Sequence, residues 1–161
     1  MKLKVLMRAN GVSDSFDAQL AYRGSLWLLE RLLTPAQQYG LDISVAMRNP
    51  ATLGGCLGKF RTYLGRPSTF TVMVNRQQGD YMKLRALCHE FVHLHQFVRG
   101  DLVYRRIGET VHTYWQGVDH TETAYDDCPW EIEAHEQEKE LARAFLRTHP
   151  LWWPAFDPRS R

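Results

Sequence analysis

The chain has 161 residues, enough for one hydrophobic core and few for two, so we expect a single domain over residues 1–161, with residues 150–161 as a C-terminal tail. Hydrophobic residues make up 44% and charged residues 24%, which excludes a largely disordered chain. The net charge of +2 lacks the concentrated basic character of a dedicated nucleic-acid binder.

The first eight residues contain an apolar stretch that is too short and too interrupted for a signal peptide. No later apolar run is long enough to cross a bilayer, so we expect no membrane partner. Cys56, Cys88 and Cys128 form no Cys-x-x-Cys pair, which predicts reduced thiols without a disulfide framework or a cysteine-rich zinc site. These features together predict a cytoplasmic protein.

Apolar periodicity and turn residues predict strands and helices along the whole chain. In chain order they are a strand over 3–7, a helix from the N-caps Asp14 and Ser15 to Pro35, a strand over 43–47, a Gly-rich loop over 53–58, a strand over 70–74, a helix over 80–98 that ends at Gly100, a hairpin of strands over 102–106 and 110–115, and a helix from Pro129. We expect an α+β fold in which a small, mostly antiparallel sheet packs against the last two helices and the N-terminal helix covers it.

The helix over 80–98 carries the sequence His-Glu-Phe-Val-His at positions 89–93. Residues four apart lie about 40° apart around a helix, so His89 and His93 can both present an imidazole nitrogen to one zinc ion. Glu90 lies beside this face, where it can act as general base for the water that zinc activates. The motif therefore predicts two zinc ligands and a catalytic base.

The opposite side of the same helix provides an independent test of this interpretation. Five apolar residues recur there at spacings of three and four, which is the pattern of a core-facing stripe. They are Leu84, Leu87, Phe91, Leu94 and Val98. The metal face and the core face are thus separated around the helix, and Gln96 projects back onto the histidine face.

A catalytic zinc site needs a third protein ligand, and the helix from Pro129 is its best source. The continuation His-x-x-Gly-x-x-His is absent, because Gln and Arg occupy positions 96 and 99. Glu131 and His135 lie four apart on one face of the acidic helix, whereas Glu133 lies about 200° around from Glu131. Only one of the two glutamates can face the metal, and we rank Glu131 before Glu133.

These residues resemble the gluzincin clan of metallopeptidases, particularly its minimal one-domain members in bacteria and phages. The resemblance covers about residues 70–146 and extends to an uncharacterised group of peptidases described as SprT-like. It is carried by His89-Glu90-x-x-His93, Trp115-x-Gly117, Tyr125 and Pro129-Trp130-Glu131-x-Glu133-Ala134.

The resemblance implies a zincin-like fold, one zinc ion and hydrolysis of peptide bonds in a protein or peptide substrate, inside a host cytoplasm if a phage encodes the chain. It also implies that Glu131 binds zinc and that an aspartate four residues later supports a ligand histidine. His135 stands at that position here, so the supporting role is open. In the clan, the strand before the catalytic helix commonly lies at a sheet edge and pairs with substrate, which here would be residues 69–74.

Two other functions remain open at this point. One is a non-catalytic, zinc-stabilised binding module. The other is a SprT-like protease that acts on DNA-associated proteins, suggested by the mild basicity and by the aromatic, Arg-rich tail at 152–161. A donor for the transition-state oxyanion is also required, and the nearby residues of suitable type are Tyr114, Tyr125, His112 and His120.

Overall fold

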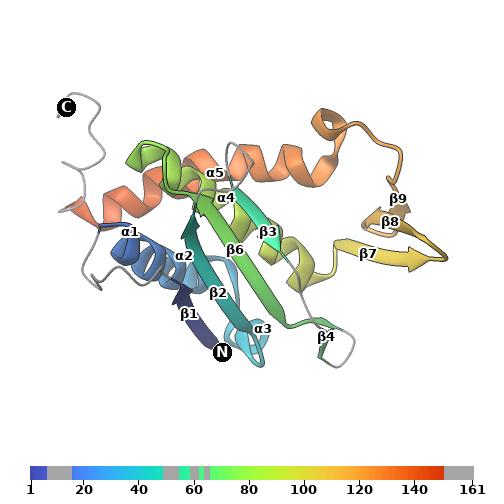
Figure 1. Ribbon diagram of the computed structural model, residues 1–161, viewed down its shortest axis with the longest axis horizontal. Helices are drawn as coiled ribbons and strands as arrows, with labels where there is room; N and C mark the ends of the chain where they lie inside the picture. The colour runs from blue at the N-terminus through green and yellow to red at the C-terminus, as the bar shows by residue number, and fades with distance from the viewer. Residues whose placement is uncertain (7–15, 49–54, 59–61, 64–65, 151–161) are drawn as a thin grey trace.

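The computed structural model describes residues 1–6, 16–48, 55–58, 62–63 and 66–150 (Figure 1). The class is α+β, as predicted. The elements in chain order are β1 (Lys2–Leu6), α1 (Phe16–Gln19), η1 (Leu20–Gly24), α2 (Ser25–Leu32), α3 (Pro35–Gln38), β2 (Asp42–Arg48), β3 (Gly55–Gly58), β4 (Thr62–Tyr63), β5 (Arg66–Pro67), β6 (Thr69–Asn75), α4 (Asp80–Arg99), β7 (Leu102–Ile107), β8 (Thr110–Trp115), β9 (Val118–Asp119), η2 (Tyr125–Asp127) and α5 (Pro129–Thr148). The predicted caps Asp14 and Ser15 and the tail from 151 onward lie outside the described residues.

The principal sheet has four strands in the order β1-β2-β6-β3. β1 pairs with β2, and β2 with β6, in parallel, whereas β3 pairs with β6 antiparallel. The prediction of a mostly antiparallel sheet against the helices was therefore wrong for this sheet. The segment α1–η1–α2 contacts both β1 and β2, and as a crossover it returns the chain to the same end of the sheet, which parallel pairing requires.

Two further expectations about this sheet are corrected by its strand order. Residues 55–58, predicted as part of a Gly-rich loop, form β3, an edge strand paired with residues 71–74. The segment 69–74, expected at the edge, lies inside the sheet between β2 and β3. The alternation of Phe70, Val72 and Val74 marks a strand with one buried face, but it contains no information about which neighbours the strand pairs with.

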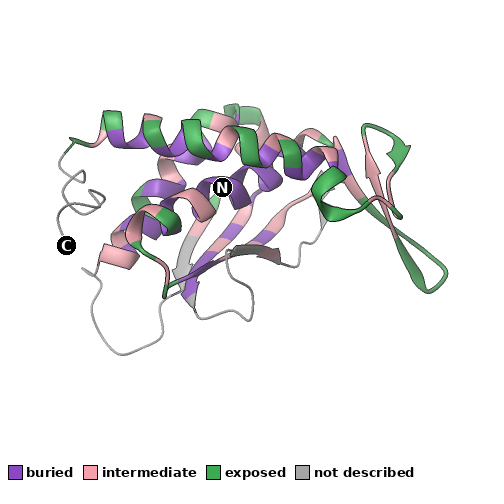
Figure 2. Cartoon of the chain, turned by 90° about the horizontal axis from the view of Figure 1, so that it is seen from above, coloured by how far each residue is buried: buried purple, intermediate pink, exposed green. Residues whose placement is uncertain are grey.

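The helices form two layers on one side of the sheet (Figure 2). α4 packs on β6 and β3, with α2 beside it, and α5 packs along α4. The predicted core stripe of α4 is confirmed, because all five of its apolar residues are buried. α5 buries a stripe of its own that contains two carboxylates, Glu131 and Glu138. Ionised side chains are rarely buried without partners, so this face of α5 marks a polar site between the two helices.

Both ends of α4 show the signals that predicted it. Asp80 lies in its first turn, and Gly100 ends it in the left-handed conformation with φ of 83°. The amide of Gly100 donates to the carbonyls of Gln96 and Phe97, which satisfies the last turn. In the described part of the chain, no helix combines the length and the apolar character that a membrane span requires.

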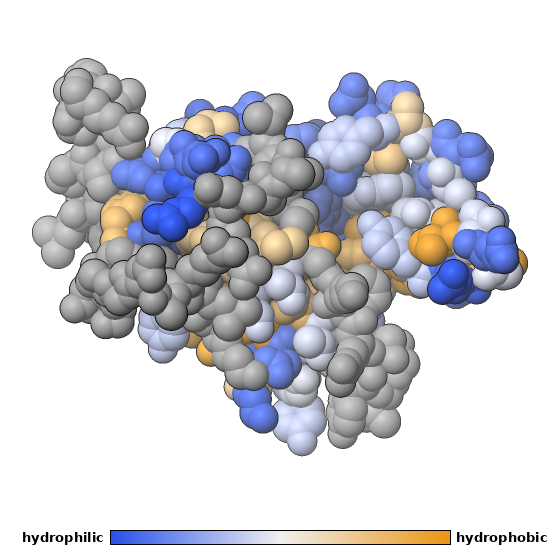
Figure 3. Space-filling view, viewed as in Figure 1, coloured by the Kyte–Doolittle hydropathy of each residue, from blue (hydrophilic) through white to orange (hydrophobic). Residues whose placement is uncertain are grey.

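The predicted hairpin is confirmed as β7 and β8, to which β9 adds a third antiparallel strand. These strands project from the end of α4, away from the principal sheet (Figure 1). Their outer part mixes hydrophilic and apolar side chains at the surface (Figure 3), and the exposed apolar ones include Ile107, Val111 and Val118. The base of the hairpin is different, because Leu102 is buried against the core.

Gly100→Ala should destabilise the protein by about 1 kcal/mol, because alanine, unlike glycine, is strained in the left-handed backbone conformation that this position adopts. No atom lies within 4 Å of the added Cβ, so packing contributes no clash. The matched control is Gly79→Ser at the N-cap of the same helix, where φ is −60° and the added Cβ also meets nothing within 4 Å. It should stabilise by about 0.5–1 kcal/mol in urea unfolding. Equal effects at the two glycines would contradict this account of the helix ends.

Candidate metal centre

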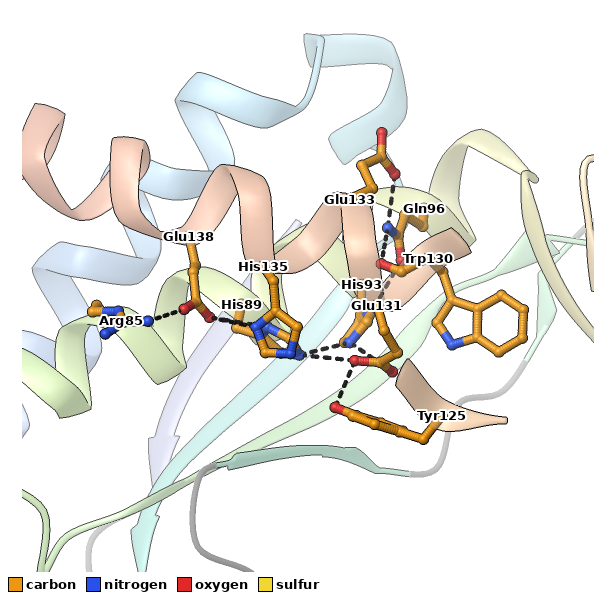
Figure 4. Close-up of polar contacts among 10 residues, drawn as sticks. All are labelled: Arg85, His89, His93, Gln96, Tyr125, Trp130, Glu131, Glu133, His135 and Glu138. Atoms are coloured by element: carbon orange, nitrogen blue, oxygen red, sulfur yellow. Dashed lines mark hydrogen bonds and ion pairs between the residues drawn. The ribbon is translucent and has the colours of Figure 1, made fainter. Parts of the chain in front are cut away.

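Three side chains from α4 and α5 converge on one point (Figure 4). The Nε2 atoms of His89 and His93 are 3.0 Å apart. Glu131 places Oε2 3.3 Å from Nε2 of His89 and Oε1 3.4 Å from Nε2 of His93. Ligand atoms about 2.0–2.1 Å from a tetrahedral zinc ion are separated from one another by about 3.3–3.4 Å. The three groups are therefore close enough together to surround one zinc ion, with a different carboxylate oxygen nearest to each imidazole.

The tautomer of His89 is fixed by a carboxylate on α5. Nδ1 of His89 lies 3.1 Å from Oε2 of Glu138, and an ionised carboxylate can only accept a hydrogen bond. Arg85 donates to the other oxygen of Glu138. Although burial raises the pKa of Glu138, these two partners lower it to about 2, so it is ionised. Nδ1 of His89 therefore carries the proton, and its Nε2 presents a lone pair to the site.

The tautomer of His93 is fixed by Gln96 on its own helix. Nδ1 of His93 lies 2.8 Å from Oε1 of Gln96. The amide nitrogen of Gln96 faces two acceptors, the carbonyl of Trp130 and a carboxylate oxygen of Glu133, so its oxygen must face His93. His93 then donates from Nδ1, and its Nε2 also points a lone pair into the site.

In their neutral forms, two imidazoles with free Nε2 lone pairs and a carboxylate thus meet within 3.4 Å. Such a set of acceptors repels itself unless a positive charge lies among them, and without a metal ion a proton on the imidazoles supplies that charge. Burial lowers the pKa of His89, but the carboxylates of Glu131 and Glu138 outweigh it and raise this pKa to about 9. Burial raises the pKa of Glu131, but the hydrogen bonds that it accepts from His89, His93 and Tyr125 outweigh burial and hold this pKa well below the usual range. The donor set and its electrostatics fit a divalent cation.

The structure separates the two glutamates that the sequence left as alternatives. Glu131 faces the two histidines and accepts a hydrogen bond of 2.7 Å from the hydroxyl of Tyr125. Glu133 faces away from the histidines toward Gln96 and Arg99, with Arg99 Nη2 2.8 and 2.6 Å from its two oxygens. Glu131 is thus the glutamate brought to the histidines.

His135 lies beside this cluster. Its ring centroid is 4.7 Å from that of His89, and each of His89, Glu131 and His135 offers a ligand atom within 4.8 Å of the others. His135 is exposed, whereas His93 is buried with Nε2 3.0 Å from that of His89 and 3.4 Å from Glu131. The buried cluster of His89, His93 and Glu131 is therefore the better candidate for a single ion. The resemblance implied that the residue at position 135 supports a ligand histidine. In this structure the carboxylate that contacts Nδ1 of His89 is Glu138.

A cavity of about 560 Å³ opens onto the cluster. Glu90 is buried in the wall of this cavity beside both histidines. Burial raises the pKa of Glu90 to about 7; the two histidines lower this pKa, and the carboxylates of Glu131 and Glu138 raise it further. A carboxylate whose pKa lies near neutrality is suited to proton transfer at physiological pH. Apolar walls are contributed by Leu57 of β3, Met82 and Phe97 of α4, Leu102 of β7 and Trp130 of α5.

Of the four residues proposed from the sequence as oxyanion donors, Tyr125 lines the cavity. Tyr114, His112 and His120 are not among the residues that line it. The ring of His112 instead lies near Tyr114 and Asp119, and that of His120 near Trp130. Tyr104 of the hairpin also lines the cavity and was not anticipated.

Several supporting residues were missed from the sequence. Glu138 follows Glu131 by seven residues and His135 by three, a spacing that puts all three on one helix face, and it was a usable signal. Arg85 precedes His89 by four residues and was equally placed. Cys88 and Cys128 are free and buried, whereas the side chain of Cys56 is not described.

Comparisons with known proteins identify no relative of this chain: no family model matches it, and neither a curated protein nor a solved structure matches it.

Arg85→Met should destabilise the metal-free protein by about 1–3 kcal/mol, because it leaves the buried carboxylate of Glu138 without its guanidinium partner. The measurement is urea unfolding in the presence of a chelator. Arg147→Met is the matched control, because its pair with Glu140 is exposed on both sides and its loss should change the stability less than the loss of Arg85 does. A double-mutant cycle with Glu138→Gln that gives coupling below about 0.5 kcal/mol would rule out the proposed pairing.

Proposed function

We propose that this protein is a zinc metallopeptidase of the gluzincin type, with His89, His93 and Glu131 as zinc ligands and Glu90 as general base. The observation that carries the proposal is the convergence of two imidazole Nε2 atoms and one carboxylate within 3.4 Å, with Nδ1 of each imidazole bound to a buried acceptor. The resemblance of the two helix motifs to gluzincins supports the same assignment.

Zinc held by such a set supplies Lewis-acid activation of water and of a peptide carbonyl. Glu90 lines the same cavity and accepts the proton of the attacking water, which it then delivers to the leaving amine. Tyr125 lines the cavity and is the best supported of the four oxyanion donors. Its single hydroxyl proton is donated to Glu131 in this structure, so the hydroxyl must leave that carboxylate to donate to the oxyanion. Glu138 and Gln96 hold the two imidazoles in place while these steps occur.

The substrate in this proposal is an extended protein or peptide segment. β3 is an edge strand, and its residue Leu57 lines the cavity, so a peptide paired with this edge would run past the histidines. The pairing strand is therefore β3 in place of the segment 69–74. The alternative of a protease for DNA-associated proteins depends on the tail at 152–161, which lies outside the described residues, and no observation in the described part favours it.

The protein should bind one zinc ion per chain, and His89→Ala, His93→Ala and Glu131→Ala should each abolish stoichiometric binding, because two remaining ligands hold zinc weakly. Glu133→Gln and His135→Ala are the matched controls and should retain one ion. The measurement is metal analysis after dialysis against a weak chelator. If His135→Ala lost the ion while His93→Ala kept it, the cluster of His89, Glu131 and His135 would be the site.

Glu90→Gln should keep the zinc ion and lose nearly all peptidase activity, at least about 100-fold, because the amide cannot accept the proton of water. Activity is measured on casein and by proteome-wide cleavage analysis. Activity that survives Glu90→Gln would remove Glu90 from the mechanism. Zinc binding without cleavage of any substrate by the wild type would instead favour the zinc-stabilised binding module.

A further inference from the structure

Gln96 is a fully buried amide on α4, three residues after His93. Its side-chain amide makes three hydrogen bonds, all with groups of the metal centre or of α5 (Figure 4). Its oxygen accepts from Nδ1 of His93 at 2.8 Å, and its nitrogen donates to the carbonyl of Trp130 at 2.9 Å and to Oε2 of Glu133 at 2.7 Å. A buried amide in the middle of a helical core is costly unless such bonds are made.

These bonds join the two helices at the level of the ligands. Trp130 directly precedes Glu131 on α5, so the carbonyl that Gln96 holds belongs to the peptide unit next to the third ligand. The amide plane of Gln96 is rigid, so its oxygen and nitrogen fix the His93 ring and the first turn of α5 at a set separation. A shift of either helix along the other would break at least one of the three bonds.

The contact to Glu133 is held in turn by Arg99. Arg99 lies one turn after Gln96 on α4 and donates to both oxygens of Glu133, while its Nε lies 2.5 Å from Asp101. Glu133 therefore keeps its acceptor oxygen directed at Gln96. This explains why the second glutamate of the acidic helix is present although it does not face the histidines.

We propose that Gln96 is a positioning residue for the metal centre, which holds His93 in its Nδ1–H tautomer and fixes the first turn of α5 so that Glu131 reaches the two histidines. The role rests on the proposed zinc site. It differs from a role in packing alone, because it predicts changes in the tautomer of His93 and in metal coordination that a loss of packing would not cause.

The decisive variant is Gln96→Leu, which keeps a similar volume and removes all three hydrogen bonds. Val92→Ala is the matched control, because Val92 is fully buried on the same helix and its truncation loses packing without touching these bonds. Zinc affinity is measured by competition with a chelating dye, and the coordination by the visible absorption spectrum of the cobalt-substituted protein. The tautomer of His93 is read from nitrogen-15 NMR of the zinc-free protein.

Gln96→Leu should weaken zinc affinity about 10–100-fold and alter the cobalt spectrum. In the zinc-free protein its His93 should shift from the Nδ1–H toward the Nε2–H tautomer, because Nδ1 has lost its acceptor whereas Nε2 still faces the carboxylate of Glu131. Val92→Ala should lower the unfolding temperature and leave the zinc affinity, the spectrum and the tautomer as in the wild type. Unchanged affinity, spectrum and tautomer in Gln96→Leu would overturn the proposal.

Two further measurements keep the outcomes separate. If Gln96→Leu does not fold, Glu133→Ala replaces it, because this variant removes one of the three hydrogen bonds of Gln96. Glu133→Ala should weaken zinc binding relative to both the wild type and Val92→Ala. A zinc affinity equal to that of the wild type would reject the role of Gln96. A wild type that binds no zinc would refute the proposed function itself. In that case the tautomer of His93 still reports whether Gln96 orients the ring.

Discussion

The packing of α5 along α4 is the contact on which the site depends. The spacing within α4 can bring two imidazoles to one side of a helix, but the third group comes from a helix that begins 30 residues after α4 ends. α5 packs along α4 and buries apolar residues, such as Ala142 and Phe145, together with two carboxylates. Apolar burial along the rest of this interface provides the free energy that holds those carboxylates away from water.

The charges in the interface are matched residue by residue. Arg85 neutralises Glu138, and Arg99 neutralises Glu133, each from α4 to α5. Glu131 instead meets two imidazoles and the hydroxyl of Tyr125. In the proposed metal site, a cation held jointly with the histidines would be the counterion of Glu131, and the two neighbouring ion pairs would hold α4 and α5 in place around it.

The site was more predictable from sequence than the sheet, for a physical reason. The helical period alone relates His89, Glu90 and His93, and the same period placed Glu131 and Glu133 on different faces of α5. Strand order is set by contacts between distant segments, so local alternation identified β6 and missed that β3 covers its edge. The contact between His89 and Glu138 was not predicted, because the resemblance assigned the supporting role to position 135. The helix period places position 138 on the same face of α5 as Glu131 and position 135.

The most direct test of the central claim is X-ray absorption spectroscopy at the zinc edge of the metal-loaded protein. The account predicts a first shell of nitrogen and oxygen atoms only, at about 2.0–2.2 Å, with the outer-shell scattering of two imidazoles. That result would agree with the lone pairs of His89 and His93 meeting the carboxylate of Glu131. A sulfur shell near 2.3 Å, or a shell without imidazole scattering, would contradict it.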